Sequence, residues 1–290
     1  MKRLAVGVLA VAGAVRLFPM LLRRVMAPPT RPQPHTPSDL GLPEVSIGLR
    51  SRSGTDLHAW FVPAGGEAPA VVVLHGWGAN ASLMLPLAPH LHGAGFHALF
   101  LDARNHGRSE HDDFVSMPRF AEDLDVAVDW LLDHPDVTAV GVIGHSVGAG
   151  AAILASSRRD DLGAVVSVAA FAHPGEAMAR SAPMNRFPAP MRAGIFRTIE
   201  RTIGYRFDEI APRATIAGVR APLLLAHGTA DRVVPIGDLE VLAAAAPQAA
   251  TLIVEGADHA SLDAFGPAVP HLIGFLSENL TGRGRTPSTA

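Results

Sequence analysis

The 290-residue chain contains no cysteine. Disulfide bonds, thiolate nucleophiles and cysteine-ligated metal sites are therefore excluded, while the cellular compartment stays open because a chain of this length can bury a large core without disulfides. An excess of positive charge is also missing: 24 basic and 27 acidic residues leave a formal net charge of -3. Such a chain has no general attraction for polyanions, so we expect no nucleic-acid partner.

The hydrophobic and charged shares of the chain, 48% and 18%, are those of a globular protein. We expect one catalytic domain over residues 44–280, preceded by an apolar segment (1–27) and a linker (28–43) and followed by a disordered polar tail (281–290). The linker holds six prolines among polar residues. This composition predicts an extended, poorly packed connector.

The N-terminal segment has membrane character. Residues 4–22 are apolar or small except for Arg16, and this length just crosses a bilayer if the arginine reaches toward one face. We therefore predict a membrane-associated protein that is anchored through this run. A short cleaved signal peptide, which the small residues at 12–14 suit, and a cytosolic helix packed on the domain are the alternatives, and they would make the protein secreted or cytoplasmic.

Eight short runs after the linker have strand character. The first two, residues 44–50 and 57–62, flank Ser53-Gly54-Thr55-Asp56 and predict an antiparallel hairpin. The other runs are apolar with little alternation, as in strands that are covered on both faces. They span residues 70–74, 98–101, 137–143, 164–169, 222–226 and 250–254.

Helical patterns lie between most of these runs. They include residues 119–133, which Pro135 follows, and residues 262–276. Alternating strands and helices predict a mostly parallel sheet with helices on both faces, and ligands of such sheets bind outside the carboxyl ends of the strands. Residues 173–220 are too long for one crossover helix and are rich in Met, Phe, Ile and Pro. We expect them to form a small helical insert that covers the site.

The pentapeptide Gly144-His145-Ser146-Val147-Gly148 matches G-x-S-x-G between an apolar strand and the helical run 147–157. Small residues on both sides allow the sharp turn that projects a serine hydroxyl at a helix N-terminus, where developing negative charge is favoured. Ser146 is therefore the predicted nucleophile. The alternative is a glycine-rich structural turn.

A serine hydroxyl needs a base, and the base needs an acid that fixes its tautomer. His259 follows the last strand, at the same sheet edge as Ser146, and is the predicted base. Asp231 lies in the loop that leaves the penultimate strand and is the predicted acid, in the chain order Ser, Asp, His. Of its rivals, Asp258 is too close in sequence to fold back readily onto the histidine, and Asp102 follows a distant strand.

Two backbone N–H groups are predicted to bind the oxyanion of a tetrahedral intermediate, each worth about 3 kcal/mol of barrier. Val147 supplies one at the serine turn. Trp77 supplies the other from His75-Gly76-Trp77-Gly78, the loop that leaves the first parallel strand. The Trp77 side chain either lines the substrate pocket or packs as a wall.

With these motifs, residues 44–280 resemble the α/β-hydrolase superfamily. A further mark is the run Asp102-Ala103-Arg104-Asn105-His106-Gly107-Arg108-Ser109, which resembles a loop that braces the site in this family. The resemblance implies an eight-stranded, mostly parallel sheet and neither a metal nor a cofactor. It does not extend to the apolar N-terminus.

Together these features predict acyl transfer through a Ser-His-Asp triad, with a small-molecule carboxylic ester or thioester as substrate. The apolar insert favours an apolar acyl or alkyl group. Acyltransferases, amidases and peptidases share the same residues and stay open, as does a non-catalytic binding protein. The physiological substrate and the oligomeric state are not determined by these patterns.

Overall fold

A computed structural model describes residues 27–29, 31–182, 184–259 and 263–281. The predicted membrane segment over residues 4–22 lies outside the described residues, as does all but the first residue of the predicted tail (281–290). Within the described ranges, no helix combines the length and the apolar character needed to cross a bilayer.

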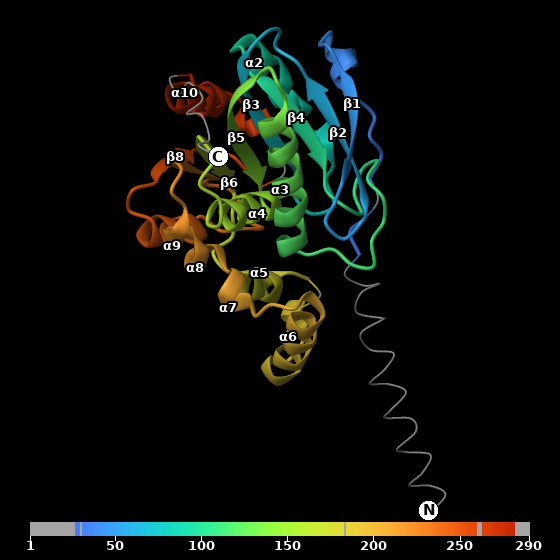
Figure 1. Cartoon of the computed structure of the whole chain (residues 1–290). Coiled ribbons are helices and arrows are strands. Elements are labelled where there is room, and N and C mark those ends of the chain that lie inside the picture. Colours follow the sequence, from blue (N-terminus) through green and yellow to red (C-terminus); the bar gives the residue numbers. More distant parts are fainter. Residues whose placement is uncertain (1–26, 30, 183, 260–262, 282–290) are drawn as a thin grey trace, which may run out of the picture.

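An eight-stranded sheet forms the centre of the molecule, in the order β1-β2-β4-β3-β5-β6-β7-β8. Strand β2 is antiparallel to β1 and to β4, and all other neighbours are parallel. The predicted fold and its hairpin are thus confirmed (Figure 1). The strands are β1 (Val45–Arg50), β2 (Asp56–Val62), β3 (Ala68–Leu74), β4 (His97–Asp102), β5 (Val137–His145), β6 (Ala164–Val168), β7 (Leu223–Gly228) and β8 (Ala250–Val254).

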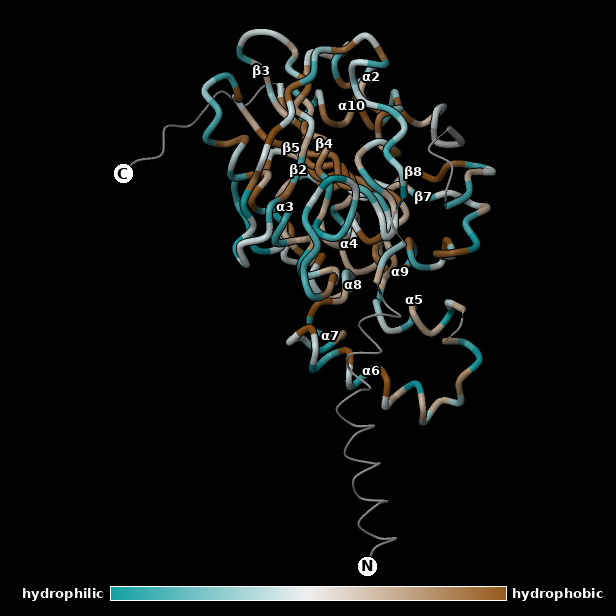
Figure 2. Tube along the Cα trace, turned by 90° about the vertical axis from the view of Figure 1, so that its right-hand side faces the viewer, coloured by the Kyte–Doolittle hydropathy of each residue, from teal (hydrophilic) through white to brown (hydrophobic). Residues whose placement is uncertain are grey.

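Both faces of the sheet are buried because its central strands contain consecutive apolar residues, which point alternately to the two faces. In β3, Val72 and Leu74 enter one core while Val71 and Val73 enter the other. Helices α3 (Met117–Asp133), α4 (Val147–Ser156) and α9 (Gly237–Ala245) cover the first face, and α2 (Ala88–Gly93) and α10 (Val269–Leu280) cover the second. Figure 2 shows the hydrophobic stretches gathered along the sheet in the middle of the molecule.

Two helix starts differ from the prediction. Helix α3 begins at Met117 rather than at residue 119, because the Ser116 side chain accepts from the Arg119 N–H and a proline suits the first turn. Helix α10 begins at Val269 rather than at residue 262, after a short 3-10 helix, η5 (Asp263–Ala268). A proline again stands in the first turn of α10.

The predicted helical insert is present between β6 and β7. It consists of α5 (Pro174–Arg180), η3 (Met184–Arg186), α6 (Ala189–Ile203), α7 (Phe207–Ile210), α8 (Pro212–Thr215) and η4 (Ile216–Gly218). Its helices α5 to α7 project beyond the carboxyl ends of the parallel strands (Figure 1). Ile195 and Ile199 of α6 are buried and join the core on the α3 and α4 side.

The proline-rich stretch before β1 is packed against the domain, so the prediction of a poorly packed connector is wrong for this part. Gln33 Nε2 donates to both carboxylate oxygens of buried Asp102, at 2.8 and 2.7 Å. Asn80 Nδ2 donates to the carbonyls of Arg31 and Pro32, both at 3.1 Å. We call residues 31–36 the N-terminal strap. It runs along the carboxyl edge of the sheet, because β4 ends at Asp102. In the chain, a short 3-10 helix, η1 (Pro37–Leu40), follows the strap, and another, η2 (Ala81–Leu87), follows Asn80.

Candidate active site

Ser146 forms the turn between β5 and α4. Its backbone has φ 55° and ψ −115°, a conformation that costs about 1–3 kcal/mol and that clusters at functional sites. The Ser146 N–H donates to Val168 O on the neighbouring strand β6 at 2.9 Å. This bond fixes the turn against the sheet and leaves the hydroxyl at the N-terminus of α4.

Two glycines allow β5 and α4 to meet at this turn. A Cβ on Gly144 would lie 2.4 Å from Gly148 O, and a Cβ on Gly148 would lie 2.5 Å from His75 O. Because both obstacles are backbone atoms, no movement of a side chain would relieve the overlap. The G-x-S-x-G spacing therefore has a steric cause in this chain.

The structure brings the three predicted triad residues together. Ser146 Oγ lies 2.9 Å from His259 Nε2, and His259 Nδ1 lies 2.7 Å from Asp231 Oδ2. An ionised carboxylate only accepts hydrogen bonds, so His259 Nδ1–H donates to it and Nε2 is left to accept from the serine hydroxyl. The catalytic role of these residues stays a prediction at this point.

Asp231 is held as a buried anion. Its side chain is 1% exposed, and its Oδ1 accepts from the N–H groups of Val233 and Val234 at 2.9 and 2.8 Å. Burial alone would raise the pKa of the carboxyl, but hydrogen bonds from His259 and from the Val234 N–H hold the pKa below its usual range. The loop after β7 thus presents a fixed negative charge to the imidazole.

Two other histidines support the loops that carry His259 and Asp231. Burial and the neighbouring His259 lower the pKa of His145 to about 4, so neutral His145 donates from Nε2 to His259 O at 3.0 Å. His227 Nε2 donates to Val234 O at 2.8 Å. Both contacts hold backbone, and neither histidine is bonded to Ser146.

The loop that leaves β3 lies directly beside the serine. A Cβ on Gly76 would lie 3.1 Å from Ser146 Cβ, so the backbone of the next residue, Trp77, starts close to Ser146. In the part of the chain that the structure describes, neither the Trp77 N–H nor the Val147 N–H donates to a protein acceptor. Their use as oxyanion donors stays a prediction.

Comparison with protein families agrees with this architecture. A family model described as serine aminopeptidase, S33, matches residues 67–210, which include the loop after β3 and the serine turn. The chain belongs to the α/β-hydrolase superfamily. No curated protein sequence matches it.

Solved structures show the same fold as this α/β-hydrolase. The esterase Pf2001 of Pyrococcus furiosus has a TM-score of 0.71 and 21% identity over 87% of this chain and 99% of that chain. Est1E from Butyrivibrio proteoclasticus, solved with ferulic acid bound, has a TM-score of 0.69 and 16% identity over 80% and 98%. The α/β-hydrolase GrgF from Penicillium sp. sh18 has a TM-score of 0.66 and 16% identity over 83% and 100%.

Two buried histidines connect the 75–78 loop of this hydrolase to the loop after β4. His106 Nε2 accepts from the Gly78 N–H at 3.0 Å, and His106 Nδ1 donates to Arg104 O at 2.8 Å. His75 Nε2 accepts from the Ala103 N–H at 3.1 Å. Burial and the nearby His75 lower the pKa of His106 to about 3, so its ring stays a neutral acceptor. Sequence reasoning placed His106 in a bracing loop but did not identify this contact.

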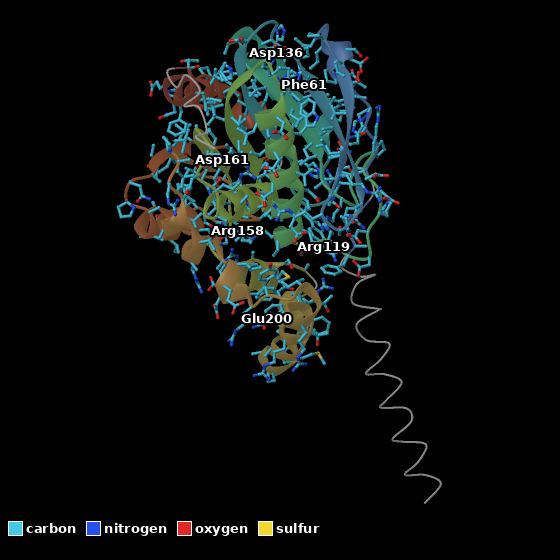
Figure 3. The ribbon with its side chains drawn as sticks, in the orientation of Figure 1. Phe61, Arg119, Asp136, Arg158, Asp161 and Glu200 are labelled. Atoms are coloured by element: carbon cyan, nitrogen blue, oxygen red, sulfur yellow. The ribbon has the colours of Figure 1, made fainter. Side chains whose placement is uncertain are left out.

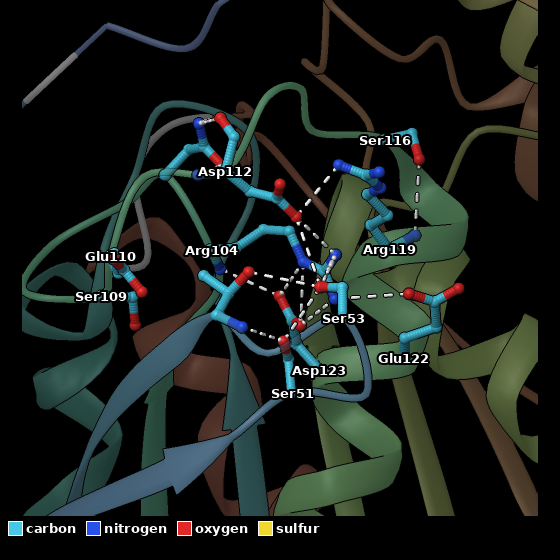
Figure 4. Close-up of polar contacts among 12 residues, drawn as sticks. Ser51, Ser53, Arg104, Ser109, Glu110, Asp112, Ser116, Arg119, Glu122 and Asp123 are labelled. Atoms are coloured by element: carbon cyan, nitrogen blue, oxygen red, sulfur yellow. Dashed lines mark hydrogen bonds and ion pairs between the residues drawn. The ribbon is translucent and has the colours of Figure 1, made fainter. Parts of the chain in front are cut away.

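Arg104 ties the loop after β4 to α3 and to the β1–β2 hairpin of the hydrolase (Figure 4). Its Nη2 lies 2.6 Å from Asp123 Oδ1, and its Nη1 lies 3.1 Å from Asp112 Oδ2 and 3.2 Å from Ser53 Oγ. Burial alone would lower the pKa of Arg104, but Asp123, Glu122 and Asp112 raise it. The side chain is therefore a charged structural anchor, as the family resemblance implied.

In the ranges that the structure describes, no group of three or more histidine, aspartate or glutamate residues is arranged to hold a metal ion. The Ser146 hydroxyl, the His259 ring and the Asp231 carboxylate are hydrogen-bonded to one another.

Proposed function

We propose that this chain is a serine hydrolase of carboxylic esters, with Ser146 as nucleophile, His259 as general base and Asp231 as the acid that orients the base. The observation that supports it is the continuous pair of hydrogen bonds from Ser146 Oγ through the imidazole to Asp231 Oδ2, at 2.9 and 2.7 Å. Such distances meet the requirement that nucleophile, base and orienting group lie within hydrogen-bond reach.

In the proposed reaction, Ser146 Oγ attacks the carbonyl carbon while its proton passes to His259 Nε2. The resulting oxyanion accepts from the N–H groups of Trp77 and Val147. The intermediate collapses as the leaving alcohol takes the proton from Nε2, and an acyl-enzyme remains. Water then gives a proton to Nε2 and attacks the acyl carbon, after which the carboxylic acid leaves and the serine regains its proton.

An apolar acyl or alkyl group fits the insert best. Met178, Met184, Phe187 and Phe196 are half-buried and pack beside the core on the insert side. Flexible thioether and aromatic side chains suit binding of an apolar chain without a fixed shape. Pf2001, one of the similar structures, is an esterase by name, which supports an ester over an amide.

A peptidase is the second candidate, because the matching family model is described as a serine aminopeptidase. An aminopeptidase needs a carboxylate that binds the free ammonium group of its substrate. The described insert carboxylates already have partners, which argues against this role. These carboxylates are Glu176, Asp208, Glu200 and Glu209, whose partners are the Arg213 side chain, the His173 side chain, the Phe207 N–H and the Arg206 N–H.

The test is hydrolysis by the full chain of p-nitrophenyl esters of increasing acyl length, beside aminoacyl p-nitroanilides. Ser146→Ala is the matched control, and a fluorophosphonate label reports the reactive serine independently of the substrate. We expect ester turnover that Ser146→Ala abolishes, with a preference for longer acyl chains. Turnover of the anilides alone would favour the peptidase, and transfer to an added alcohol in place of hydrolysis would favour an acyltransferase.

Absence of both turnover and label would overturn the triad assignment and favour a binding protein. A labelled but inactive chain would retain the nucleophile and refute only the choice of substrate.

A further inference from the structure

One part of the insert, residues 184–206, concentrates positive charge. Residues 184–206 contain five arginines and one acidic residue, Glu200, in a chain with a net charge of -3. Four of these arginines are exposed. They are Arg186, Arg197, Arg201 and Arg206.

These arginines differ from Arg180 and Arg213 of the insert, which have ion-pair partners. Arg180 binds Asp238 at 2.5 Å and Arg213 binds Glu176 at 2.7 Å. Glu200, the acid within residues 184–206, accepts from the Phe207 N–H at 2.9 Å. Among the described residues, none of the four exposed arginines forms an ion pair. Their charge is therefore available to an external anion.

Helix α6 has an exposed face of small residues between these arginines. Its inner face is fixed by Ile195 and Ile199, while Ala193 and Gly194 are exposed. Two exposed apolar side chains flank this face, Met191 at 54% and Tyr205 at 39%. Basic residues beside small and apolar ones, with a tyrosine at the border, are typical of a surface that lies in the headgroup region of a bilayer. We call this surface the α6 face.

The chain enters the domain at the same edge of the sheet. The strap contacts Asn80 and Asp102, which follow β3 and end β4 at their carboxyl ends. Four residues separate the end of the predicted membrane segment at Leu22 from the first described residue, Ala27. The five steps from Leu22 to Ala27 span at most about 17 Å. A membrane segment over residues 4–22 would thus hold the carboxyl edge, and the α6 face with it, close to the lipid surface.

We propose that the α6 face binds an anionic phospholipid surface and turns the carboxyl edge of the sheet, with Ser146, toward that surface. The inference does not depend on the acyl-transfer chemistry. Each arginine near an anionic leaflet favours contact about fivefold, so three of them favour it about 100-fold. Unpaired arginines, exposed apolar residues and an apolar run that leads into the same edge together favour a lipid surface over another anionic partner.

A single-cysteine label tests the contact, because the chain has no other cysteine. Gly194→Cys on α6 has open space around its Cβ, as does Gly93→Cys at the end of α2. Position 93 precedes β4 and therefore lies at the amino edge of the sheet. In Figure 3, Asp136 at that edge and Glu200 on α6 lie at opposite ends of the molecule. Each full-length variant carries a fluorophore and is mixed with vesicles that contain a lipid-borne quencher.

We expect quenching of the label at 194, but not at 93, with vesicles of equal parts phosphatidylcholine and phosphatidylglycerol, and little with phosphatidylcholine alone. Arg197→Gln, Arg201→Gln and Arg206→Gln combined should lower the ratio of lipid-contacting to free α6 about 100-fold. Arg220→Gln, at an exposed arginine before β7, should change nothing. Equal quenching at both positions, quenching independent of lipid charge, or a label at 194 that stays in water would overturn the proposal. An intact ester turnover beside such a result would leave the proposed function standing.

Discussion

The hydrogen bond from the Gly78 N–H to His106 predicts that a residue outside the triad controls the oxyanion loop. His106→Phe keeps an aromatic ring beside Phe120 and His75, whose ring centroids lie 5.2 and 4.9 Å away. It removes both ring nitrogens, however. The Gly78 N–H then loses its acceptor and Arg104 O loses its donor, so the loop after β3 is released from the loop after β4.

The expected loss of stability follows from these two lost hydrogen bonds. A buried group without a partner costs about 1–3 kcal/mol, so two groups that relax in part lower the free energy of unfolding by about 3 kcal/mol. The loop that relaxes carries the Trp77 N–H. Complete loss of an oxyanion donor lowers kcat about 10²–10³-fold, and a displaced donor should cost about 30-fold. KM should change little, because the contact forms only in the transition state.

Steady-state hydrolysis of a p-nitrophenyl ester, combined with urea unfolding of the same protein, measures both effects. His106→Gln is the matched control: its side-chain oxygen can accept from the Gly78 N–H, so we expect kcat within about fivefold of the wild type. Fluorophosphonate labelling shows that Ser146 remains reactive in each variant. A His106→Phe enzyme with unchanged kcat and unchanged unfolding free energy would refute the reasoning.

Three further predictions concern the site and its supports. Asp231→Asn should lower kcat about 10⁴-fold with the fold intact, because an amide no longer holds His259 in the required tautomer. Steady-state rates of ester hydrolysis measure this loss, and a loss of kcat below about tenfold would contradict the prediction. Gly148→Ala should destabilise the protein by about 2–3 kcal/mol through overlap with backbone atoms of the loop after β3, which urea unfolding measures. Acid should destabilise the protein through His106 and His145, whose burial lowers their pKa values from 6.5 to about 3 and about 4. Below pH 6.5 the unfolded chain binds protons that the folded chain does not, so stability is complete above about pH 6.5 and falls toward pH 4; a flat profile of unfolding free energy between these values would count against it.

The sheet was predictable from sequence because β1 and β2 flank a hairpin signal at residues 53–56 and each of the strands β3 to β8 contains a short apolar run. All eight predicted runs are strands in the structure. The runs themselves carry the signal, since strands covered on both faces need apolar residues without alternation. Helix ends were less predictable: the start of α10 depends on where the preceding 3-10 helix ends, which periodicity does not encode.

The triad residues could be placed at one edge from sequence, because each follows a strand of a parallel sheet. The contacts that support the triad residues could not be predicted from sequence. Gln33 and Asp102 are 69 residues apart and meet only because the strap crosses the end of β4. His106 and Gly78 are 28 residues apart, on loops after neighbouring strands. A proline-rich composition predicts an extended chain, but an extended chain can still pack when buried acceptors such as the Asp102 carboxylate face it.

These supports explain how a strained nucleophile turn can persist. The positive φ of Ser146 costs free energy, and a residue keeps such a conformation only where several surrounding contacts hold it in place. Here the neighbouring strand holds the Ser146 N–H, His106 holds the adjacent loop through Gly78, and the strap holds the same loop through Asn80. Displacing any one of these elements leaves a buried polar group without a partner. The geometry proposed for acyl transfer is therefore a property of the whole carboxyl edge, and a lipid surface that contacts this edge would act on the loops that position the oxyanion donors.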